Sequence, residues 1–434
     1  MNPLVSSEVE TRRAPPDPAC VERSRNTSAP TNPVCVERSR DTSAPRSLDD
    51  TRDKRDLEAK SNLALYVHWP FCVSKCPYCD FNSHVRDNVD QTAWRDALLA
   101  DLAHEAALLP DRRLTSIFFG GGTPSLMAPA TVEAVIAAAR GHWATSDDLE
   151  ITLEANPNSA EAANFADLAR AGVNRISLGL QSFDDAALAF LGRAHSADEG
   201  QRALAAAQSA VDRVSFDLIY ALPGDDEAKW SRHLDRAIAL GTKHLSLYQL
   251  TIEPGTRFAS MVAKHEFEPL DAETCATLFE LTQTHTAAAG IPAYEISNHA
   301  RPGAESRHNL TYWRYGDYAG VGPGAHGRRL GMRTVRHKKP ENFLAAIARN
   351  GHGLVEEELL SSAEAASEAL VMGLRLAEGI DLAALERRFD RPIVKSAAVD
   401  RLVGHGLLSR NGPRLATTET GRLLLDSILA DVAA

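Results

Sequence analysis

Residues 66–81 read YVHWPFCVSKCPYCDF, and this stretch decides how the rest of the chain is interpreted. It contains Cys72, Cys76 and Cys79 in the spacing C-x-x-x-C-x-x-C, directly after an apolar run that predicts a strand. Three thiolates so close in sequence can hold three irons of a [4Fe–4S] cluster and leave the fourth iron without a protein ligand. An iron with an open coordination position is a site where a small molecule can bind and react.

Zinc is the alternative metal for this cysteine loop. Structural zinc takes four ligands, often as two separated Cys or His pairs. After residue 60 the chain has one further cysteine, Cys275, which stands far along the sequence in an apolar helical context and is predicted to be a small buried hydrophobe. His68 and His84 could complete a zinc site, but neither repeats the spacing of a zinc knuckle. The triad therefore predicts an iron–sulfur cluster.

The composition of the 434 residues is that of a globular protein, with 44% hydrophobic and 24% charged residues. The length predicts two or three domains. No apolar run reaches the length of a membrane span, and the N-terminus lacks the apolar segment of a secretory signal, which favours a cytoplasmic protein. Residues 1–60 contain eleven basic and eleven acidic residues, so the net charge of −11 lies in the remainder and argues against a nucleic-acid partner.

Residues 1–60 are predicted to form a disordered, low-complexity tail because they are rich in Pro, Ser, Thr, Asp and Arg and poor in large apolar residues. The tail contains a near-exact repeat, CVERSRNTSAP at 20–30 and CVERSRDTSAP at 35–45. Cys20 and Cys35 open the two copies, but a cluster needs ordered surroundings. We interpret the tail as an extension without a function of its own.

Alternating strands and helices follow the tail. Apolar runs predict six strands, at residues 63–68, 115–119, 150–154, 175–180, 213–219 and 244–250. The stretches between them predict helices, at residues 93–109, 131–140, 160–170, 197–210 and 227–240. Strands separated by long helices form βαβ units with right-handed crossovers and a parallel sheet. The predicted fold class is therefore α/β, with a partial (β/α)6 barrel whose site lies at the C-terminal ends of the strands.

The last third of the chain is predicted to be less regular. A helix at 270–289, a short strand at 293–296 and a loop at 297–327 come first, and then helical segments, at residues 341–349, 362–376, 382–389 and 393–404. Residues 407–417 resemble a β-wing around Asn411 and Gly412. We predict a division into the tail at 1–60, a core at 61–296 and a C-terminal region at 297–434 that ends in an α-rich, winged-helix-like domain.

Glycine and polar residues stand at the predicted strand ends. Residues 118–124, FFGGGTP, close the second strand, and glycine N–H groups there could bind a carboxylate or phosphate. Glu154 and Gln181 end the third and fourth strands, and Asp217 lies in the fifth. Taken alone, Glu154 and Gln181 could be surface residues at strand ends, and Asp217 could form a structural hydrogen bond. Together, at one barrel mouth, they predict a ligand site, to which Arg193 could add a cation.

These motifs together resemble the core of radical S-adenosylmethionine (SAM) enzymes. More narrowly, YVHWPFC at 66–72 and GRAH at 192–195 resemble the oxygen-independent coproporphyrinogen III oxidase group, over about residues 62–425. The resemblance implies that SAM binds the open iron through its amino and carboxylate groups, and that the cofactor supplies any radical chemistry. It implies nine SAM-binding residues, namely Tyr66, Tyr78, Gly121, Gly122, Thr123, Glu154, Gln181, Arg193 and Asp217.

Two subfamilies share this core. The oxidase has a fourth cysteine two residues beyond the triad, where this chain has Phe81, and an ordered N-terminal segment that residues 1–60 do not resemble. Both differences favour the HemW-type heme chaperones. The resemblance continues in four later segments, YQLTIEPGT at 248–256, HNLTYW at 308–313, GVGPGAHG at 320–327 and LVMGLR at 370–375.

The segment HNLTYW resembles a family motif that is tied to heme binding. Imidazole is a common heme-iron ligand, and Tyr and Trp faces can pack on the macrocycle. His308 is the predicted axial ligand, with His326 and His299 as rivals. The alternative is a structural histidine that is hydrogen-bonded in a Gly-rich loop.

The sequence thus predicts a cytoplasmic heme chaperone with a [4Fe–4S] cluster and exchangeable SAM. Its expected partners are heme, an unidentified heme-accepting protein and, for any redox step, an electron donor. The alternative is an oxygen-independent coproporphyrinogen III oxidase, which decarboxylates two propionate side chains, and a radical SAM enzyme with another substrate is a third hypothesis. Whether SAM is cleaved, and hence whether the protein is an enzyme, is left open.

Overall fold

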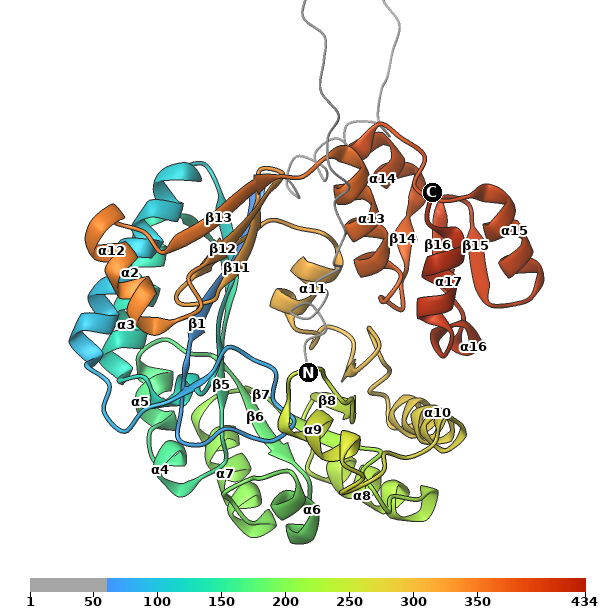
Figure 1. Ribbon diagram of the computed structural model, residues 1–434, viewed down its shortest axis with the longest axis horizontal. Coiled ribbons are helices and arrows are strands. Elements are labelled where there is room, and N and C mark those ends of the chain that lie inside the picture. Colours follow the sequence, from blue (N-terminus) through green and yellow to red (C-terminus); the bar gives the residue numbers. More distant parts are fainter. Residues whose placement is uncertain (1–60) are drawn as a thin grey trace, which may run out of the picture. The chain divides into compact units, whose positions relative to one another are not determined.

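The computed structural model describes residues 61–434, in which the chain forms one large sheet and two small ones (Figure 1). The predicted tail, residues 1–60, with its repeat and with Cys20 and Cys35, lies outside the described residues. Its disorder and its lack of a function therefore stay predictions.

Six parallel strands form the centre of the large sheet and confirm the predicted partial (β/α)6 barrel. In spatial order they are β1 (Asn62–Trp69), β4 (Arg113–Gly121), β5 (Ala144–Ala155), β6 (Arg175–Gln181), β7 (Arg213–Tyr220) and β8 (His244–Gln249). Every neighbouring pair among them is parallel. Their C-terminal ends therefore lie along one edge of the sheet, as the predicted site requires.

Helices connect these strands, and polar residues begin most of them. The connections carry α2 (Gln91–Leu108), α3 (Pro129–His142), α4 (Ser159–Ala162), α5 (Phe165–Arg170), α6 (Asp185–Phe190), α7 (Ala197–Ala210) and α8 (Glu227–Ala239). Ser196 and Glu199 form a capping box at the start of α7, so that orphan N–H groups of its first turn are paired. The single helix predicted at 160–170 is wrong, because α4 ends at Ala162 and α5 begins only at Phe165.

After β8 come α9 (Arg257–Ala263) and α10 (Ala272–Ala288), and α10 confirms the helix predicted at 270–289. The sheet then continues on both sides of the barrel strands. β9 (Asn298–Ala300) pairs antiparallel with β8, and α11 (Arg307–Trp313) follows it. β10 (Tyr318–Val321) pairs parallel with β1 on the opposite side of the sheet.

Three further strands extend the sheet beyond β10. They are β11 (His326–Arg329), β12 (Met332–Arg336) and β13 (Leu354–Leu359), all antiparallel, with α12 (Pro340–Asn350) between the last two. The predicted loop at 297–327 is therefore wrong, and so is the strand at 293–296, where Ala293 forms only an isolated bridge to His299. Strands of three to five residues carry too little periodicity to be recognised without their pairing partners. The division at residue 296 stays a prediction.

A buried ionic cluster fastens this extension to α2. Arg336 donates to Asp101 (Nε to Oδ2, 3.1 Å) and to Glu105 (Nη2 to Oε1, 2.6 Å), and Arg329 Nε donates to Glu105 Oε2 at 2.7 Å. The side chains of Arg336, Asp101 and Glu105 are fully buried. Removing one partner would leave an uncompensated buried charge, which is strongly destabilising.

The C-terminal part confirms the predicted winged-helix-like arrangement. It consists of α13 (Ser362–Gly373), β14 (Ile380–Asp381), α14 (Leu382–Phe389), α15 (Ser396–Gly404), β15 (Leu408–Asn411), β16 (Arg414–Thr417), α16 (Glu419–Arg422) and α17 (Leu425–Val432). The three strands form their own sheet in the order β14-β16-β15, and β15 and β16 are the predicted wing. A second hydrophobic cluster around Leu370, Val399 and Leu415 holds these elements together.

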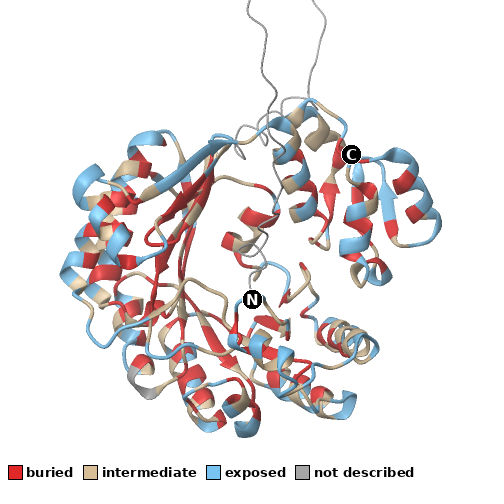
Figure 2. Cartoon of the chain, in the orientation of Figure 1, coloured by how far each residue is buried: buried red, intermediate tan, exposed pale blue. Residues whose placement is uncertain are grey.

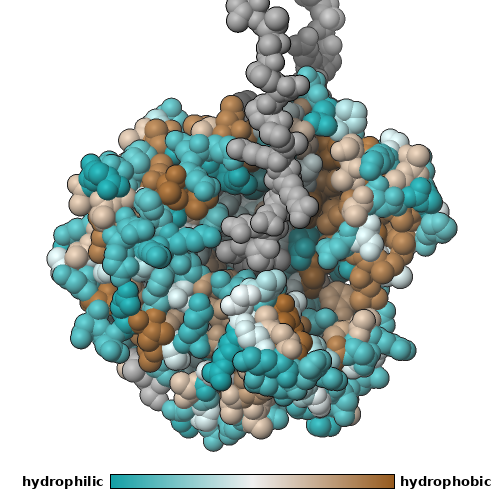
Figure 3. All heavy atoms as spheres, in the orientation of Figure 1, coloured by the Kyte–Doolittle hydropathy of each residue, from teal (hydrophilic) through white to brown (hydrophobic). Residues whose placement is uncertain are grey.

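Buried residues follow the barrel strands and the inner sides of the helices (Figure 2). Fully buried side chains of β1, such as Leu63, Leu65 and Trp69, belong to one continuous core with those of the neighbouring strands. The face in Figure 3 carries mainly hydrophilic side chains over the barrel helices. Within residues 61–434, no helix combines the length and the apolar character that crossing a membrane requires.

Candidate functional site

The cysteine loop lies directly after β1, at the C-terminal edge of the parallel strands. Cys72 ends the short strand β2 (Phe71–Cys72), which pairs with β3 (His84–Val85), and Cys76 and Cys79 stand in the loop between them. All three are half-buried free thiols. The Cys79 backbone N–H donates to the Cys76 carbonyl at 3.2 Å, so a tight turn carries the last two thiols.

Three thiols in one loop are the donor set that a [4Fe–4S] cluster with one open iron requires. Among the described residues, no group of three Cys, His, Asp or Glu side chains is arranged to hold one metal ion. In a [4Fe–4S] site each cysteine ligates a different iron, so the three cysteine sulfurs need not converge on one point. Burial raises the pKa of Cys79 to about 11, and the neighbouring Cys76 and Cys72 add to the rise. The three thiols are thus close enough to influence one another.

Two sulfurs accept hydrogen bonds from side chains outside the cysteine loop, one after β4 and one between α6 and α7. The Thr123 hydroxyl donates to Cys72 Sγ at 3.3 Å, and Arg193 Nη1 donates to Cys76 Sγ at 3.4 Å. Asn156 connects these donors, because its Nδ2 donates to Thr123 Oγ1 at 2.9 Å while its Oδ1 accepts from Arg193. Hydrogen bonds to sulfur tune an iron–sulfur centre. Sequence reasoning missed Asn156, and the only signal was its place directly after the predicted strand that ends in Glu154.

The glycine turn at residues 120–122 contacts the backbone at the start of the cysteine loop. Gly122 N–H donates to the Trp69 carbonyl at 2.7 Å, and a Cβ on Gly122 would lie 2.7 Å from the Phe71 carbonyl oxygen. Gly121 has a φ of +114°, and a Cβ there would lie 2.6 Å from the His68 ring. The next residues form a short 3-10 helix, η1 (Pro124–Leu126). Close backbone approach at Gly122, and the positive φ of Gly121, therefore require glycine independently of any ligand.

His68 links the barrel interior to the end of the cysteine loop. Its Nδ1 lies 2.9 Å from the Tyr66 hydroxyl and its Nε2 lies 2.9 Å from the Asn82 carbonyl. Burial lowers the pKa of His68 to about 4, so the ring is neutral, and a carbonyl can only accept. Nε2 is therefore the protonated nitrogen, and Nδ1 accepts from Tyr66. Asn82 Nδ2 donates in turn to the carbonyls of Pro323 and Lys338, each at 2.9 Å.

Two half-buried carboxyl groups face the same end of the barrel. Glu154 Oε2 accepts from the Gly121 N–H at 3.2 Å. Burial raises the pKa of Glu154 to about 8, and Asp217 adds to the rise. Burial likewise raises the pKa of Asp217, against hydrogen bonds from Ser246 and Ser177. Neither carboxyl group forms an ion pair with the part of the chain that the structure describes, so an ammonium or hydroxyl group of a ligand would suit them.

Further polar atoms at this end are buried without a partner among residues 61–434. They include Gln181 Oε1 and Arg193 Nε. Gln181 has a φ of +67°, a backbone conformation that residues other than glycine rarely adopt. Tyr78 is buried next to Arg193 and Cys76, and it holds the pKa of Arg193 above its ordinary value although burial acts in the opposite direction. Unpartnered buried groups and backbone strain together are features of a ligand site.

The structure therefore brings the nine predicted SAM residues and the three cysteines to one end of the barrel. Their roles toward SAM and the cluster stay predictions.

The Cys275 thiol is half-buried and lies 3.8 Å from the Leu270 carbonyl, in contact with the hydrophobic core. His84 Nε2 lies 3.2 Å from Asn82 Oδ1, so it supports the loop that Asn82 anchors.

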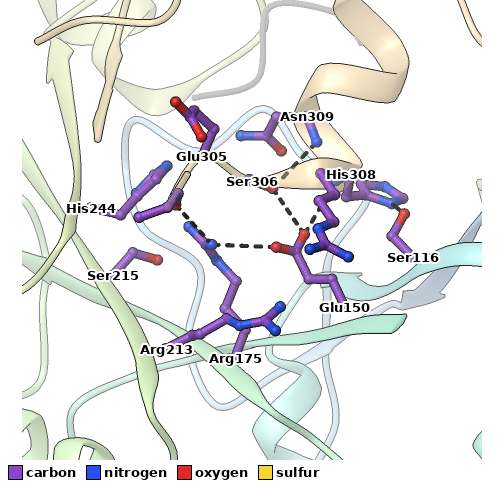
Figure 4. A network of polar contacts seen from close by, with 12 residues as sticks. Ser116, Glu150, Arg175, Arg213, Ser215, His244, Glu305, Ser306, His308 and Asn309 are labelled. Carbon is purple, nitrogen blue, oxygen red and sulfur yellow. Dashed lines mark hydrogen bonds and ion pairs between the residues drawn. The ribbon is translucent and has the colours of Figure 1, made fainter. Parts of the chain in front are cut away.

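His308 lies against the middle of the barrel strands. Figure 4 shows it beside Ser116 of β4 and Glu150 of β5, which pair in register, each five residues before the last residue of its strand. The His308 N–H donates to Glu150 Oε1 at 3.2 Å, and the buried Arg175 at the start of β6 pairs with Glu150 at 3.3 Å. Ser306, which caps α11, also donates to Glu150. This network fixes α11, and with it the motif HNLTYW, against β4, β5 and the start of β6.

Both ring nitrogens of His308 are occupied in this arrangement. Nδ1 lies 3.1 Å from Ser116 Oγ and Nε2 lies 3.0 Å from the Tyr312 hydroxyl, while the ring stacks on Phe118 with centroids 4.7 Å apart. Burial lowers the pKa of His308 to about 3. A neutral imidazole can ligate a metal ion. For His308 to ligate one, its hydrogen bond to Ser116 or to Tyr312 would have to break.

His299 and His326, the alternative predicted heme ligands, have different surroundings from His308. His299 of β9 is fully buried, with Nδ1 2.9 Å from Thr286 Oγ1 and with Nε2 unpartnered among the described residues. His326 opens β11 and is half-buried. Burial lowers the pKa of both imidazoles, to about 3 for His299. Heme ligation by any of the three stays a prediction.

This fold, with a triad of cysteines at the C-terminal ends of six parallel strands, defines a radical SAM protein. Residues 66–237 match the family described as the Radical SAM superfamily, and residues 360–424 match the family described as the HemN C-terminal domain. A solved structure of coproporphyrinogen III oxidase (HemN) from Escherichia coli superimposes with a TM-score of 0.72, at 22% identity over 86% of this chain and 90% of that chain. That likeness shows the shared fold.

Curated relatives identify the family more narrowly. The heme chaperone HemW of Escherichia coli is 37% identical over 85% of this chain and 97% of its own length. Radical S-adenosyl methionine domain-containing protein 1, mitochondrial, of Mus musculus is 39% identical over 86% of this chain and 87% of its own length. The HemW of Mycobacterium tuberculosis is 36% identical, with coverage of 84% and 93%. The chain belongs to the HemW family of radical SAM proteins, as the sequence motifs predicted.

Proposed function

We propose that this protein is a heme chaperone, which binds heme together with a [4Fe–4S] cluster and exchangeable SAM and transfers the heme to an acceptor protein. The observation that carries the proposal is its similarity to proteins named heme chaperone HemW, at 35–37% identity over more than four-fifths of this chain. Phe81 supports it, because the oxidase subfamily has a cysteine at this position.

Cys72, Cys76 and Cys79 would hold the cluster, and Thr123 and Arg193 would hydrogen-bond to its sulfur ligands. The bound cluster would supply an iron that the amino and carboxylate groups of SAM can ligate. The half-buried carboxyl groups of Glu154 and Asp217, which form no ion pair within the described residues, would receive polar groups of SAM. Exchange of SAM would change how many of these groups are paired, and thereby the stability of this end of the barrel.

Heme would bind on the C-terminal side of the predicted division, where residues 297–434 contain the motif HNLTYW. His308 is the proposed axial ligand, and release of the Tyr312 hydroxyl would free its Nε2. His299 and His326 remain the rivals. Residues 61–296 would then bind the cluster and SAM, and Tyr66, whose ring lies 6.2 Å from those of Phe118 and His308, would adjoin both parts.

The acceptor would be a protein of the same compartment. We propose the cytoplasm, where reducing conditions keep thiols available as metal ligands. If SAM is cleaved, an electron donor is a further partner. Coproporphyrinogen III oxidase activity is the second candidate function, and the fold shared with the Escherichia coli oxidase favours it.

One experiment on anaerobically reconstituted protein separates the two functions. Heme titration should give a saturable Soret band, and bound heme should pass to the apo-form of a heme protein from the same cell faster than to apomyoglobin. Coproporphyrinogen III with SAM and a reductant should be left unchanged. Formation of protoporphyrinogen would overturn the chaperone proposal, and so would the lack of a heme-dependent Soret change.

A further inference from the structure

Glu161 is a buried carboxylate that forms no ion pair within residues 61–434. It lies in the short helix α4, a few residues after the C-terminal end of β5, and it is 2% exposed. The buried carboxylates of Asp101, Glu105 and Glu150 pair with arginines instead. Taking a carboxylate out of water is costly unless other groups stabilise it, so the partners of Glu161 indicate what the residue does.

Three neutral donors hold the Glu161 carboxylate. The Ser125 hydroxyl and the Asn156 backbone N–H donate to Oε2, the second of them at 2.9 Å, and Asn158 Nδ2 donates to Oε1. Asn158 Oδ1 accepts in turn from the Glu161 N–H at 2.9 Å. Ser125 belongs to η1, which follows β4, whereas Asn156 directly follows β5. Glu161 therefore joins the segments that follow two neighbouring strands, and it fixes the backbone position of Asn156.

The amide group of Asn156 has one possible orientation. Its oxygen accepts from Arg193 Nη2, and its nitrogen lies 2.9 Å from Thr123 Oγ1. A guanidinium group only donates, so the amide oxygen must face Arg193 and the amide nitrogen must face Thr123. The chemistry of Arg193 thus makes Asn156 a donor toward Thr123.

This orientation decides where the Thr123 hydroxyl directs its hydrogen. Thr123 is 2% exposed, and its oxygen already accepts from Asn156. A hydroxyl group has one hydrogen, which at Thr123 is left for Cys72 Sγ, 3.3 Å away. Arg193 Nη1 donates to Cys76 Sγ at 3.4 Å. Two of the three predicted cluster ligands therefore receive hydrogen bonds from side chains that contact Asn156.

We propose that Glu161 and Asn156 position the hydrogen bonds that the sulfur ligands of the [4Fe–4S] cluster receive, and thereby raise the reduction potential of the cluster. This inference rests on the proposed function, because it requires the three cysteines to hold a cluster. A reduced cluster carries one more negative charge than an oxidised one, so hydrogen bonds to its sulfur ligands favour the reduced form. Glu161 and Asn156 are positioning residues, since they act through Thr123 and Arg193.

The test measures the reduction potential of the cluster in full-length, anaerobically reconstituted protein without SAM. A dye-mediated redox titration followed by electron paramagnetic resonance gives the potential. Iron and sulfide analysis gives the cluster content of each variant, and urea unfolding shows whether each variant folds.

Glu161→Ala and Glu161→Gln test the contacts of the Glu161 carboxylate. Both variants remove the same negative charge, but glutamine retains an oxygen that can accept from Ser125 and from the Asn156 N–H. The potential of Glu161→Ala should therefore be more negative than that of Glu161→Gln. Equal potentials would overturn the positioning role of Glu161.

Asn156→Asp tests the orientation of the Thr123 hydroxyl. A carboxylate only accepts, so the hydroxyl would donate to it and no longer to Cys72, and the potential should become more negative. The added charge acts in the same direction. The same substitution in a Thr123→Val background measures the charge effect alone, because valine has no hydroxyl. The shift should be larger in the wild-type background, and equal shifts would contradict the role of Asn156.

Asn174→Asp is the matched control. Asn174 also connects separate segments, because its Oδ1 accepts from the Ile151 N–H at 2.9 Å and its Nδ2 donates to the Leu149 carbonyl at 2.8 Å. It directly precedes β6 and lies at the opposite end of that strand from Gln181. The control should lose stability and keep the wild-type potential. A shift as large as that of Asn156→Asp would mean that any loosening of the barrel changes the potential, and the proposal would fail.

Failure of the proposed function would look different. If wild-type protein shows no four-iron signal after reconstitution and reduction, the cluster assignment and this inference fail together. If a cluster forms and every variant keeps the wild-type potential, only this inference fails. If Glu161→Ala does not fold or does not bind a cluster, the Asn156 and Thr123 variants decide the outcome, because they keep the Glu161 carboxylate.

Discussion

Arg193 Nη1 donates to Cys76 Sγ at 3.4 Å, although 117 residues separate the two in sequence. The same guanidinium group donates to the Gly179 carbonyl at 3.0 Å and to Asn156 Oδ1. One side chain thus joins the cysteine loop to the ends of β5 and β6. A planar group with several fixed donors can do this, whereas an ammonium group on a flexible stem cannot reach all three acceptors in one geometry.

Arg193→Lys should therefore weaken the cluster site although it keeps the charge. We expect lower iron and sulfide content after reconstitution and faster loss of the cluster absorbance in air. Arg202→Lys, on the exposed side of α7, is the control and should resemble wild type. Equal cluster stability in both variants would show that the sulfur contact has no influence on the cluster.

Replacing Cys72, Cys76 or Cys79 by serine should abolish the cluster, because each thiolate would ligate a different iron. The free thiol of Cys275 contacts the hydrophobic core instead, so Cys275→Ser should retain full iron content. Iron and sulfide analysis and electron paramagnetic resonance of the reduced protein measure the outcome. Retention of a four-iron signal in any of the three loop variants would contradict the assignment.

Gly122→Ala should destabilise the protein and loosen the cysteine loop. The added Cβ would lie 2.7 Å from the Phe71 carbonyl oxygen and 2.9 Å from the Pro70 carbonyl carbon, so backbone atoms must shift. Forced overpacking of this kind costs about 1–3 kcal/mol. Gly141→Ala is the control, because a Cβ in α3 at that position meets no atom within 4 Å and should stabilise by about 0.5–1 kcal/mol. Urea unfolding measures both.

Glu154→Gln should change how stability depends on pH. The pKa of Glu154 is raised from 4.5 to about 8, so the folded protein keeps a proton that the unfolded chain releases between these values. This contribution is complete below about pH 4.5 and is lost as the pH rises through about 8.

Relative to Glu154→Gln, wild-type apoprotein should therefore lose about 1.4 kcal/mol of unfolding free energy per pH unit across this window. Urea unfolding at several pH values measures the difference between the two proteins. A difference that does not change with pH would mean that Glu154 titrates normally in the folded protein.

Tyr312→Phe and His308→Ala should shift heme affinity in opposite directions. The phenylalanine variant removes only the hydroxyl that occupies His308 Nε2 at 3.0 Å, which frees this nitrogen for iron. The loss of one hydrogen bond is worth about 1 kcal/mol, so affinity should rise about fivefold. His308→Ala should weaken binding and shift the Soret maximum. Unchanged spectra in both variants would exclude His308 as a ligand and favour His299 or His326.

Local patterns in the sequence determined the cysteine triad, the six barrel strands and the glycine turn. Each of these depends on spacing or periodicity within a short segment, which neighbouring residues alone impose. Glu154, Gln181 and Asp217 could be grouped for a related reason, because the ends of parallel strands must share one edge of the sheet.

Only the tertiary structure decided which distant residues meet. Strands β10 to β12 are too short to recognise without their partners, and the contacts of Asn82, Asn156 and Arg193 depend on how separate segments of the chain are brought together. The sequence pattern also could not reveal that Ser116 and Tyr312 occupy both ring nitrogens of His308. Burial and pairing are properties of the packed chain, because the same arginine is solvated in one environment and uncompensated in another.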